Sequence, residues 1–368
     1  MRVPKRFVLA AALPVCPHAA VAQSDARRAF VAHVDSSAAS FLASLPAAGL
    51  SIVVVRGADT LIAKGYGFSD VGAKRRATAN TVYEIGSLTK QFTAAAIMRL
   101  VERGRLRLDD DVARYVPTFP TQGHRVTIRN LLNHTSGIHN YTAKQEWRSH
   151  WAEDLSPDSV VGFVKRDTFD FAPGTKESYS NTGYMLLGMV IEKVTGRSYA
   201  AVLDEEFFKP LGLTRTHYCQ QHPVDPDVAK GYSVKNGGFV PADYLSMTHP
   251  FAAGAICSTV SDLARWESLF HHGHVVSPAS YAQMIAPTTL SNGKKVNYGF
   301  GLSIVNMGFE DGNHPAIAHN GGINGFLSIQ AYLPADSLIV VALENTDAKD
   351  PSQFAIDAVA AALRAHLR

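Results

Sequence analysis

The sequence predicts a mixed α/β (α+β) fold, in which an antiparallel sheet flanked by helices is interrupted by an inserted, mostly α-helical lobe. Short β-rich runs occur near both ends of the chain, at 51–67 and again between 298 and 345. Helical patterns fill the middle, from about 127 to 290. Because one sheet can be assembled from distant segments, we expect the β runs of both ends to form a single sheet.

The N-terminal residues 1–22 have the pattern of a secretory signal peptide. Three basic residues within the first six positions precede an apolar run over 7–16, and Ala-Val-Ala at 20–22 forms a small-x-small cleavage site before Gln23. The apolar run is too short to span a membrane. Lipid attachment at Cys16 is disfavoured, because the bulky Val15 precedes it. We therefore predict an exported protein, periplasmic or secreted, without a membrane anchor.

Composition excludes several function classes. The chain has 35 Lys and Arg and 32 Asp and Glu, and the predicted leader holds three of the basic residues and no acidic one, so the mature chain is neutral. A neutral chain does not indicate a nucleic-acid partner, and the sequence has no basic run with interleaved aromatics. Two cysteines, Cys219 and Cys257, remain after cleavage, and the sequence leaves open whether they pair. We expect a monomer.

The elements follow in order. The β runs 51–55 and 60–67 flank a short RGAD connection and indicate a hairpin. A helix is predicted over 87–103, where apolar residues recur at helical spacing before Gly104. Helical patterns follow at 126–137, 156–167, 181–196, 198–212 and 259–273, then β runs at 298–305, 316–321, 325–334 and 337–345, and a final helix over 351–367. We assign 23–115 and 290–368 to an α/β lobe and 116–289 to a helical lobe, together one domain over 23–368.

Ser87 and Lys90 stand three positions apart at the start of a predicted helix. They project from one face, so the amine lies within hydrogen-bond reach of the hydroxyl. A helix N-terminus favours an alkoxide, disfavours an ammonium and offers a free backbone N–H to a developing oxyanion. The alternative is an ordinary capping serine beside a surface lysine, and the pair alone does not separate the two interpretations.

Two further motifs point to the same chemistry. In Tyr179-Ser180-Asn181, a tyrosine beside a lysine ammonium can have a lowered pKa and act as a general base, while the amide can hold both Lys90 and a substrate carbonyl. In the run 319–322 (HNGG), between two β runs, glycines let a substrate lie along a strand edge and Gly322 offers an oxyanion N–H. The alternative for the first motif is a loop tyrosine followed by a capping Ser or Asn. For the second motif taken alone, a glycine-rich hairpin is the favoured interpretation.

Taken together and in this order, SLTK (87–90), YSN (179–181) and HNG (319–321) resemble the serine β-lactamase and penicillin-binding protein superfamily, whose signature is S-x-x-K, Y-x-N and H-x-G. They are similar to the branch of class C β-lactamases, D-alanyl-D-alanine carboxypeptidases, D-aminopeptidases and related esterases. Segments from about 50 to 345 resemble family segments in family order. The resemblance implies a β-lactamase/transpeptidase-like fold.

The resemblance also implies residue roles. Ser87 would be the acylated nucleophile, Lys90 its activating partner and Tyr179 the general base that relays the proton to the leaving group. Substrate binding would fall to Asn181, His319, Gly321 and Gly322, with the N–H groups of Ser87 and Gly322 facing the oxyanion. The protons of Lys90, Tyr179 and His319 would belong to a coupled set. No metal and no organic cofactor is implied.

One departure bears on substrate. His319 stands where class C β-lactamases have lysine, and a histidine that is only partly charged near neutral pH is a weaker carboxylate anchor. We therefore predict an exported serine hydrolase that forms an acyl-enzyme on Ser87 and acts on small-molecule or peptide amides or esters, peptidoglycan-derived peptides among them, as a D-Ala-type peptidase, amidase or esterase. The alternatives are a β-lactamase and a non-catalytic penicillin-binding or sensor protein.

The run HHGH at 271–274 suggests a zinc site at first sight. We interpret it instead as a helix C-terminus, where histidines are favoured and Gly273 ends the helix. No carboxylate follows at ligand spacing.

Overall fold

The computed structural model describes residues 17–44, 47–219, 226–365 and 367, with the backbone alone over 17–22. The first 16 residues of the predicted signal peptide lie outside this range, and helix α1 (Pro17–Ser44) contains the remainder together with the predicted cleavage position. No helix of the described residues is both long and apolar enough to cross a membrane.

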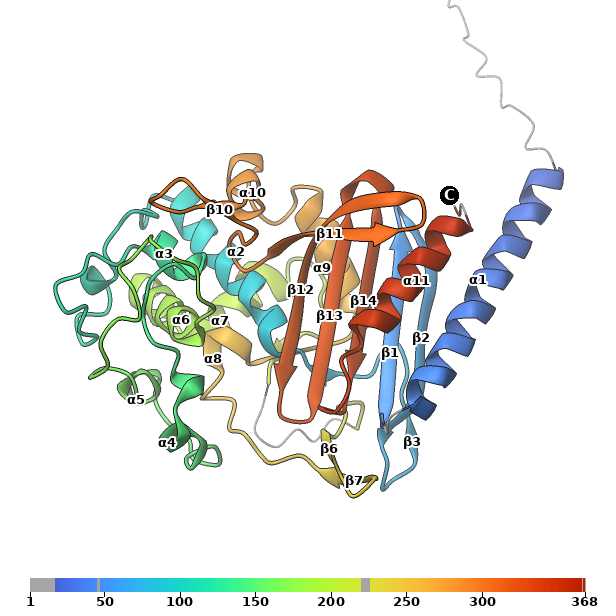
Figure 1. The fold of residues 1–368 in the computed structure, drawn as a ribbon, viewed down its shortest axis with the longest axis horizontal. Coiled ribbons are helices and arrows are strands. Elements are labelled where there is room, and N and C mark those ends of the chain that lie inside the picture. Colours follow the sequence, from blue (N-terminus) through green and yellow to red (C-terminus); the bar gives the residue numbers. More distant parts are fainter. Residues whose placement is uncertain (1–16, 45–46, 220–225, 366, 368) are drawn as a thin grey trace, which may run out of the picture.

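A seven-stranded sheet joins the two ends of the chain, as predicted (Figure 1). Its order is β11-β12-β13-β14-β1-β2-β3, and all neighbours are antiparallel. The strands are β1 (Gly49–Arg56), β2 (Asp59–Asp70), β3 (Arg75–Arg76), β11 (Ser303–Phe309), β12 (Gly312–Ile323), β13 (Phe326–Leu333) and β14 (Leu338–Glu344). The junction is the β1–β14 pair, in which Val53 lies opposite Val341. Both are buried valines, which suit a central strand.

Both faces of the sheet are covered. Along β14, side chains alternate between two cores, because successive residues of a strand point to opposite faces. Val340 packs in the core beneath α1 and α11 (Ser352–Arg364), whereas Val341 packs in the larger core on the other face. Figure 1 shows α11 crossing one face of the sheet while α9 lies behind it.

Helix α9 (Val260–His271) packs against β1 and β14, although the boundaries drawn from the sequence place residues 260–271 in the helical lobe. The helix is buried on more than one side. Gln330 of β13 donates to the Glu267 carboxylate of α9 at 2.6 Å, whereas the Trp266 ring packs against Phe92 of the 89–102 helix, with ring centres 4.0 Å apart. Helix α9 therefore lies between the sheet and the helical lobe.

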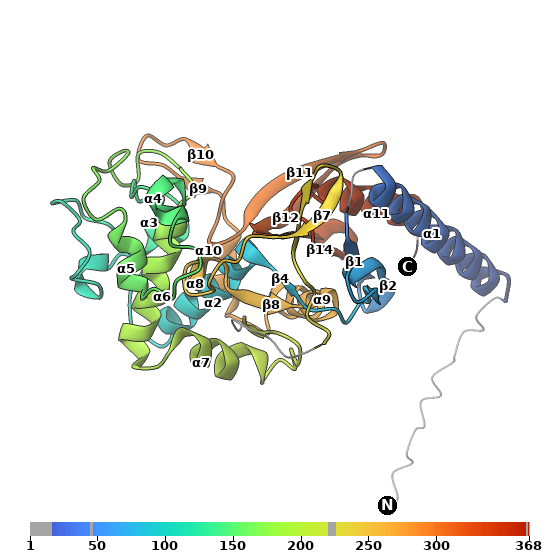
Figure 2. The same cartoon turned by 90° about the horizontal axis from the view of Figure 1, so that it is seen from below.

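The helical lobe lies at the other end of the molecule from α1 (Figure 2). Its α-helices are α2 (Thr89–Glu102), α3 (Ile128–Leu132), α4 (Gln145–Arg148), α5 (Pro157–Gly162), α6 (Asn181–Thr195), α7 (Tyr199–Leu203), α8 (Phe251–Gly254) and α10 (Pro278–Met284). Helix α2 and the turns at 86–88 and 112–114 fall within 23–115, which the sequence boundaries assign to the α/β lobe, but α2 packs against α6, α7 and α8. Single turns add η1 (Gly86–Leu88), η2 (Val112–Arg114), η3 (Tyr141–Ala143) and η4 (Asp204–Phe208), with η5 (Pro334–Asp336) in the sheet lobe. Helices α2 and α6 pack together in the main core, and both begin at the candidate site.

Small sheets complete the fold. The order β4-β8-β5 joins β4 (Tyr83–Glu84), β8 (Ile256–Ser258) and β5 (His217–Tyr218), and two hairpins form from β6 (Tyr232–Lys235) with β7 (Gly238–Pro241) and β9 (Thr288–Thr289) with β10 (Lys295–Val296). A disulfide joins Cys219 to Cys257, which resolves the pairing that the sequence leaves open. This bond fixes the end of β5 to β8.

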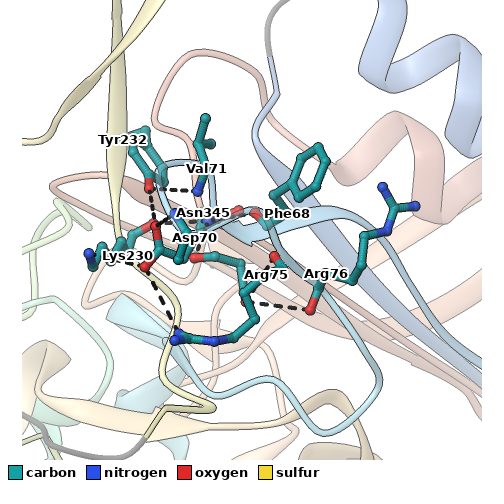
Figure 3. Close-up of polar contacts among 10 residues, drawn as sticks. Phe68, Asp70, Val71, Arg75, Arg76, Lys230, Tyr232 and Asn345 are labelled. Atoms are coloured by element: carbon teal, nitrogen blue, oxygen red, sulfur yellow. Dashed lines mark hydrogen bonds and ion pairs between the residues drawn. The ribbon is translucent and has the colours of Figure 1, made fainter.

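A polar cluster at one end of the sheet fixes the segment that carries β6 and β7 (Figure 3). The nearly buried Asp70 carboxylate forms an ion pair with Lys230 Nζ at 3.0 Å and accepts a hydrogen bond from the Ala73 N–H. The Asn345 amide donates to the carbonyls of Phe68 and Lys230. These contacts anchor residue 230 to the sheet, upstream of the 242–250 segment that reaches the candidate site.

Candidate active site

The candidate site lies where η1, the start of α6 and the end of β12 meet. Ser87 belongs to the single 3₁₀ turn η1, and the α-helix itself begins at Thr89. Gly86, before the serine, has a φ of +51°, a conformation that disfavours side chains. The predicted helix is thus correct, but the serine occupies a tight turn in front of it.

Lys90 and Ser87 meet as predicted from their spacing. The Lys90 amine contacts Ser87 Oγ at 3.0 Å, Asn181 Oδ1 at 2.8 Å and the Ala253 carbonyl at 2.8 Å. The Lys90 side chain is fully buried. The alternative of a solvated surface lysine is therefore wrong.

Burial holds the pKa of the Lys90 amine well below its usual value, because the charged form loses its hydration. A neutral amine has two N–H groups and one lone pair. Asn181 Oδ1 and the Ala253 carbonyl are acceptors and take the two hydrogens, so the lone pair faces Ser87. In this state Lys90 is placed to accept the proton of the Ser87 hydroxyl.

Tyr179 reaches Ser87 from another direction. Its hydroxyl donates to Ser87 Oγ at 2.7 Å, while 37% of the residue stays exposed. Burial of the hydroxyl raises the pKa of Tyr179, contrary to the lowering expected beside an ammonium. Burial outweighs the hydrogen bond with Ser87, which acts in the lowering direction, and the Lys90 amine lies over the face of the tyrosine ring, 4.7 Å from its centre. The phenol is thus placed as a proton donor in this state.

His319 lies within strand β12, in agreement with the predicted β run over 316–321, and the strand continues through the glycines that the sequence places between two runs. Its Nε2 contacts the Tyr298 hydroxyl at 2.9 Å, and its Nδ1 contacts the Asn320 carbonyl at 2.5 Å. Because that carbonyl can only accept, Nδ1 carries the hydrogen. Burial and the nearby Lys90 lower the pKa of His319 to about 4. His319 is therefore neutral near pH 7, with both nitrogens bonded within the protein.

The two glycines after His319 bring β12 against the nucleophile. Pairing between β11 and β12 ends at Ala318, so the rest of β12 extends beyond its neighbour and lies against η1. A Cβ on Gly321 would lie 2.2 Å from the Ile85 carbonyl and 3.0 Å from the Ser87 nitrogen, and one on Gly86 would lie 2.9 Å from the Gly322 nitrogen. Only glycine permits this approach, which puts the Ser87 and Gly322 N–H groups on adjacent segments.

Two contributors were missed in the sequence analysis. Tyr298 holds His319, but it sits in a short NYGFG stretch with no motif signal. The Ala253 carbonyl, which fixes Lys90, is a backbone group and has no signature in the sequence. His134 is buried with its ring 4.3 Å from that of Tyr179, and its Nδ1 accepts from the Ser180 N–H. It therefore braces the YSN segment.

A cavity of about 350 Å³ opens beside the nucleophile. Ser87, Asn181 and Gly322 line it, together with aromatic residues of the helical lobe. Lys90, Tyr179, His319 and Gly321 are not among its lining residues. The site thus divides into a proton-transfer side and an open binding side.

Within the described part of the chain, no group of three or more His, Cys, Asp or Glu side chains is placed to hold a metal ion. His271, the first histidine of HHGH, is buried against Glu267 and Tyr281, at 3.0 Å and 2.8 Å from its two ring nitrogens. The helix C-terminus interpretation agrees with α9 ending at this residue.

Comparisons with known proteins identify a family and several relatives. The protein-family model described as Beta-lactamase matches residues 34–364. Penicillin-binding protein 4* of Bacillus subtilis is 34% identical over 292 residues, which cover 75% of this chain and 63% of that protein. Protein flp of Staphylococcus aureus is 28% identical over 305 residues, with 82% of this chain and 60% of that protein covered. The chain thus spans less than two thirds of the length of these curated relatives.

Solved structures are also similar. The octameric penicillin-binding protein homologue from Pyrococcus abyssi has a TM-score of 0.80 and 31% identity, covering 91% of this chain and 77% of that one. The D-stereospecific amidohydrolase from Streptomyces sp. has a TM-score of 0.74 and 28% identity, covering 92% and 97%. Both alignments extend over the sheet and the helical lobe, so they bear on the whole described fold.

Proposed function

Because this chain belongs to the Beta-lactamase family, we propose that it is a serine hydrolase that forms an acyl-enzyme on Ser87. The observation that carries the proposal is the position of the Ser87 hydroxyl, 3.0 Å from the Lys90 amine and 2.7 Å from the Tyr179 hydroxyl. A nucleophile needs a base to take its proton and a donor to protonate the leaving group, and both are present here.

In acylation, the neutral Lys90 amine takes the proton of Ser87 as Oγ attacks the substrate carbonyl. The N–H groups of Ser87 and Gly322 would stabilise the oxyanion, since η1 and β12 hold them on adjacent segments. Tyr179 then gives its proton to the leaving nitrogen or oxygen, and Lys90 returns a proton to the tyrosine. Tyr179 thus relays a proton to the leaving group, as the resemblance implies, but in this proposal Lys90 and not Tyr179 is the first group to accept the proton of Ser87.

In deacylation the roles run in reverse. The leaving group departs and water takes its place near the Tyr179 hydroxyl. The relay of Tyr179 and Lys90 accepts the proton of this water as it attacks the acyl carbon, and Ser87 regains its hydrogen. One set of groups thus serves both half-reactions, as microscopic reversibility requires.

For substrate class, we propose amides of D-configured residues, with esters as activated surrogates. The neutral, internally bonded His319 cannot supply the cationic carboxylate anchor expected of a class C β-lactamase. The similarity to a D-stereospecific amidohydrolase at 28% identity supports the amide choice. We further propose that the protein is exported and works as a monomer without metal or cofactor.

A second candidate is a penicillin-binding protein that is acylated without efficient turnover, in view of the 34% identity to penicillin-binding protein 4*. The two functions share acylation of Ser87 and differ in deacylation. A static free enzyme of either kind would show the same contacts, so turnover separates them.

The test uses purified protein with a fluorophosphonate, a D-alanine p-nitroanilide, a short p-nitrophenyl ester and a chromogenic cephalosporin. We expect one adduct on Ser87 by intact-mass analysis and multiple turnovers of the D-amide and the ester. Both should vanish in Ser87→Ala and persist in Ser291→Ala, a matched change at an exposed serine. An adduct with no turnover supports the second candidate, and no adduct on Ser87 refutes both. If the cephalosporin is cleaved with by far the highest kcat/KM, the protein is a β-lactamase and the substrate class proposed from His319 is wrong.

A further inference from the structure

The binding side of the site has one charged group. Among the described residues that line the cavity beside Ser87, Arg148 is the only charged side chain. It is exposed, at the end of α4, and no hydrogen bond or ion pair of its guanidinium is formed with the described residues. A guanidinium offers five N–H donors in a planar fork that matches a carboxylate.

Nearby acidic residues do not neutralise this guanidinium. Glu153 Oε1 contacts the His150 ring at 3.0 Å, and Asp154 Oδ1 accepts from the Ser246 hydroxyl at 2.6 Å. Glu146 is closer along the chain, but it forms no ion pair with Arg148 either, since residues two positions apart on a helix do not face each other. None of these three carboxylates is therefore paired with the guanidinium. Arg148 keeps its bonding capacity for something that enters the cavity.

The wall beside Arg148 is apolar and fixed. Trp147 packs edge-on against Tyr141 and Trp151, with ring centres 5.2 Å and 5.5 Å apart. His249 ties the wall together, because its Nδ1 accepts from the Trp147 indole at 2.9 Å and its carbonyl accepts from the Tyr141 hydroxyl at 2.7 Å. Such a wall is preorganised, so a ligand spends little binding energy on ordering it.

The cavity receives the acyl side of the substrate. The leaving atom must come within reach of the Tyr179 hydroxyl to be protonated, and Tyr179 does not line the cavity, whereas Ser87 and Gly322 do. The leaving group and the acyl group lie on opposite sides of the substrate carbonyl carbon. With the leaving group at Tyr179, the acyl group that remains on Ser87 then points into the cavity. Arg148 would therefore contact the part of the substrate that is retained in the acyl-enzyme.

We propose that this enzyme prefers acyl groups that have an apolar body ending in a carboxylate, with the body against Trp147 and Trp151 and the carboxylate on Arg148. The inference rests on the proposed acylation of Ser87 and adds the chemistry of the acyl group. Arg148 is a specificity-determining residue in this proposal and takes no part in bond making.

The test compares two esters that share a leaving group and a chain: the p-nitrophenyl half-ester of adipic acid and its methyl-capped neutral counterpart. We expect wild type to favour the anionic ester, with the ratio of the two kcat/KM values falling about tenfold in Arg148→Gln. Arg148→Lys should retain part of the preference, and Arg148→Glu should reverse it. Arg166→Gln removes an exposed charge of the helical lobe that does not line the cavity and should leave the ratio unchanged.

The outcomes separate the two proposals. Hydrolysis of both esters that depends on Ser87, with a ratio that does not respond to Arg148, overturns the inference and leaves the serine hydrolase intact. If neither ester is cleaved and Ser87 forms no adduct, the proposed function fails. In that case calorimetry still tests the anion site, with the mono-p-nitroanilide of adipic acid as ligand and Ser87→Ala as the protein. Binding must weaken when salt is added and when Arg148→Gln is introduced, or the site does not exist.

Discussion

A pair of neighbouring glycines gives a sharp test of the oxyanion geometry. A Cβ added to Gly321 would lie 2.2 Å from the Ile85 carbonyl oxygen and 2.3 Å from Ser328 Oγ, whereas one added to Gly322 would have its nearest contact at 3.4 Å, with Leu327. The first change must push β12 and the nucleophile turn apart by about 1 Å, and a displacement of that size can cost about 10²-fold in rate. The second fits without displacement and keeps its N–H.

We therefore expect Gly321→Ala to lower kcat/KM by about 10²- to 10³-fold, the range for loss of one oxyanion donor. Gly322→Ala should retain most of the activity. The assay is hydrolysis of a p-nitrophenyl ester, with the rate of Ser87 labelling by a fluorophosphonate as a second readout and thermal unfolding as a check on folding. Equal activity of the two folded variants would refute the reasoning, because the close approach would then play no part in placing the donors.

The remaining predictions concern buried titratable groups. Glu344 is fully buried, neither carboxylate oxygen has a hydrogen-bond partner among the described residues, and burial raises the pKa of Glu344 to about 9. The folded state keeps this proton while the unfolded state loses it above about pH 4.5, so the wild type should lose stability as pH rises. Glu344→Gln should be more stable by on the order of 5 kcal/mol at pH 8 and by much less at pH 5, measured by urea unfolding; equal gains at both pH values would contradict this account. His319 should give the opposite pH dependence of stability, because its pKa in the folded protein is lowered to about 4. As pH falls below about 6.5, the histidine takes up a proton in the unfolded chain before it does so in the folded one. Wild type should therefore lose up to about 3 kcal/mol more than His319→Gln between pH 7 and pH 4, and any acid limb of kcat/KM between pH 5 and 8 should persist in that variant.

Much of the fold was predictable because its signals are local. The β1–β2 hairpin follows from two β runs around a turn, and α2 and α6 follow from helical periodicity with a terminal glycine. The single sheet built from both ends of the chain was predictable because β patterns occur near the two ends and helical patterns lie between them. The contact of α9 with the sheet was not predictable, because an amphipathic pattern shows that a face is buried but not which element covers it.

The candidate site divides in the same way. The resemblance carried by SLTK, YSN and HNG implied that these residues meet, and the i, i+3 spacing allowed the contact between Ser87 and Lys90 that the structure shows. What the sequence could not determine is protonation, because a pKa depends on burial and on partners far along the chain. The Ala253 carbonyl takes one hydrogen of the Lys90 amine, burial lowers the pKa of His319, and Tyr298 binds the His319 ring.

The binding side belongs wholly to the tertiary structure. Arg148 lies 61 positions from Ser87 along the chain, in a short helix with no motif, and it shares a cavity with the nucleophile only because His249 holds the aromatic wall in place. By itself, the sequence predicted the chemistry that we propose for Ser87, since the motifs that carry it are a few side-chain types at fixed spacing. The proton positions and the proposed acyl-group preference could be argued only from the tertiary structure, because desolvation and cavity shape arise only when distant segments pack together.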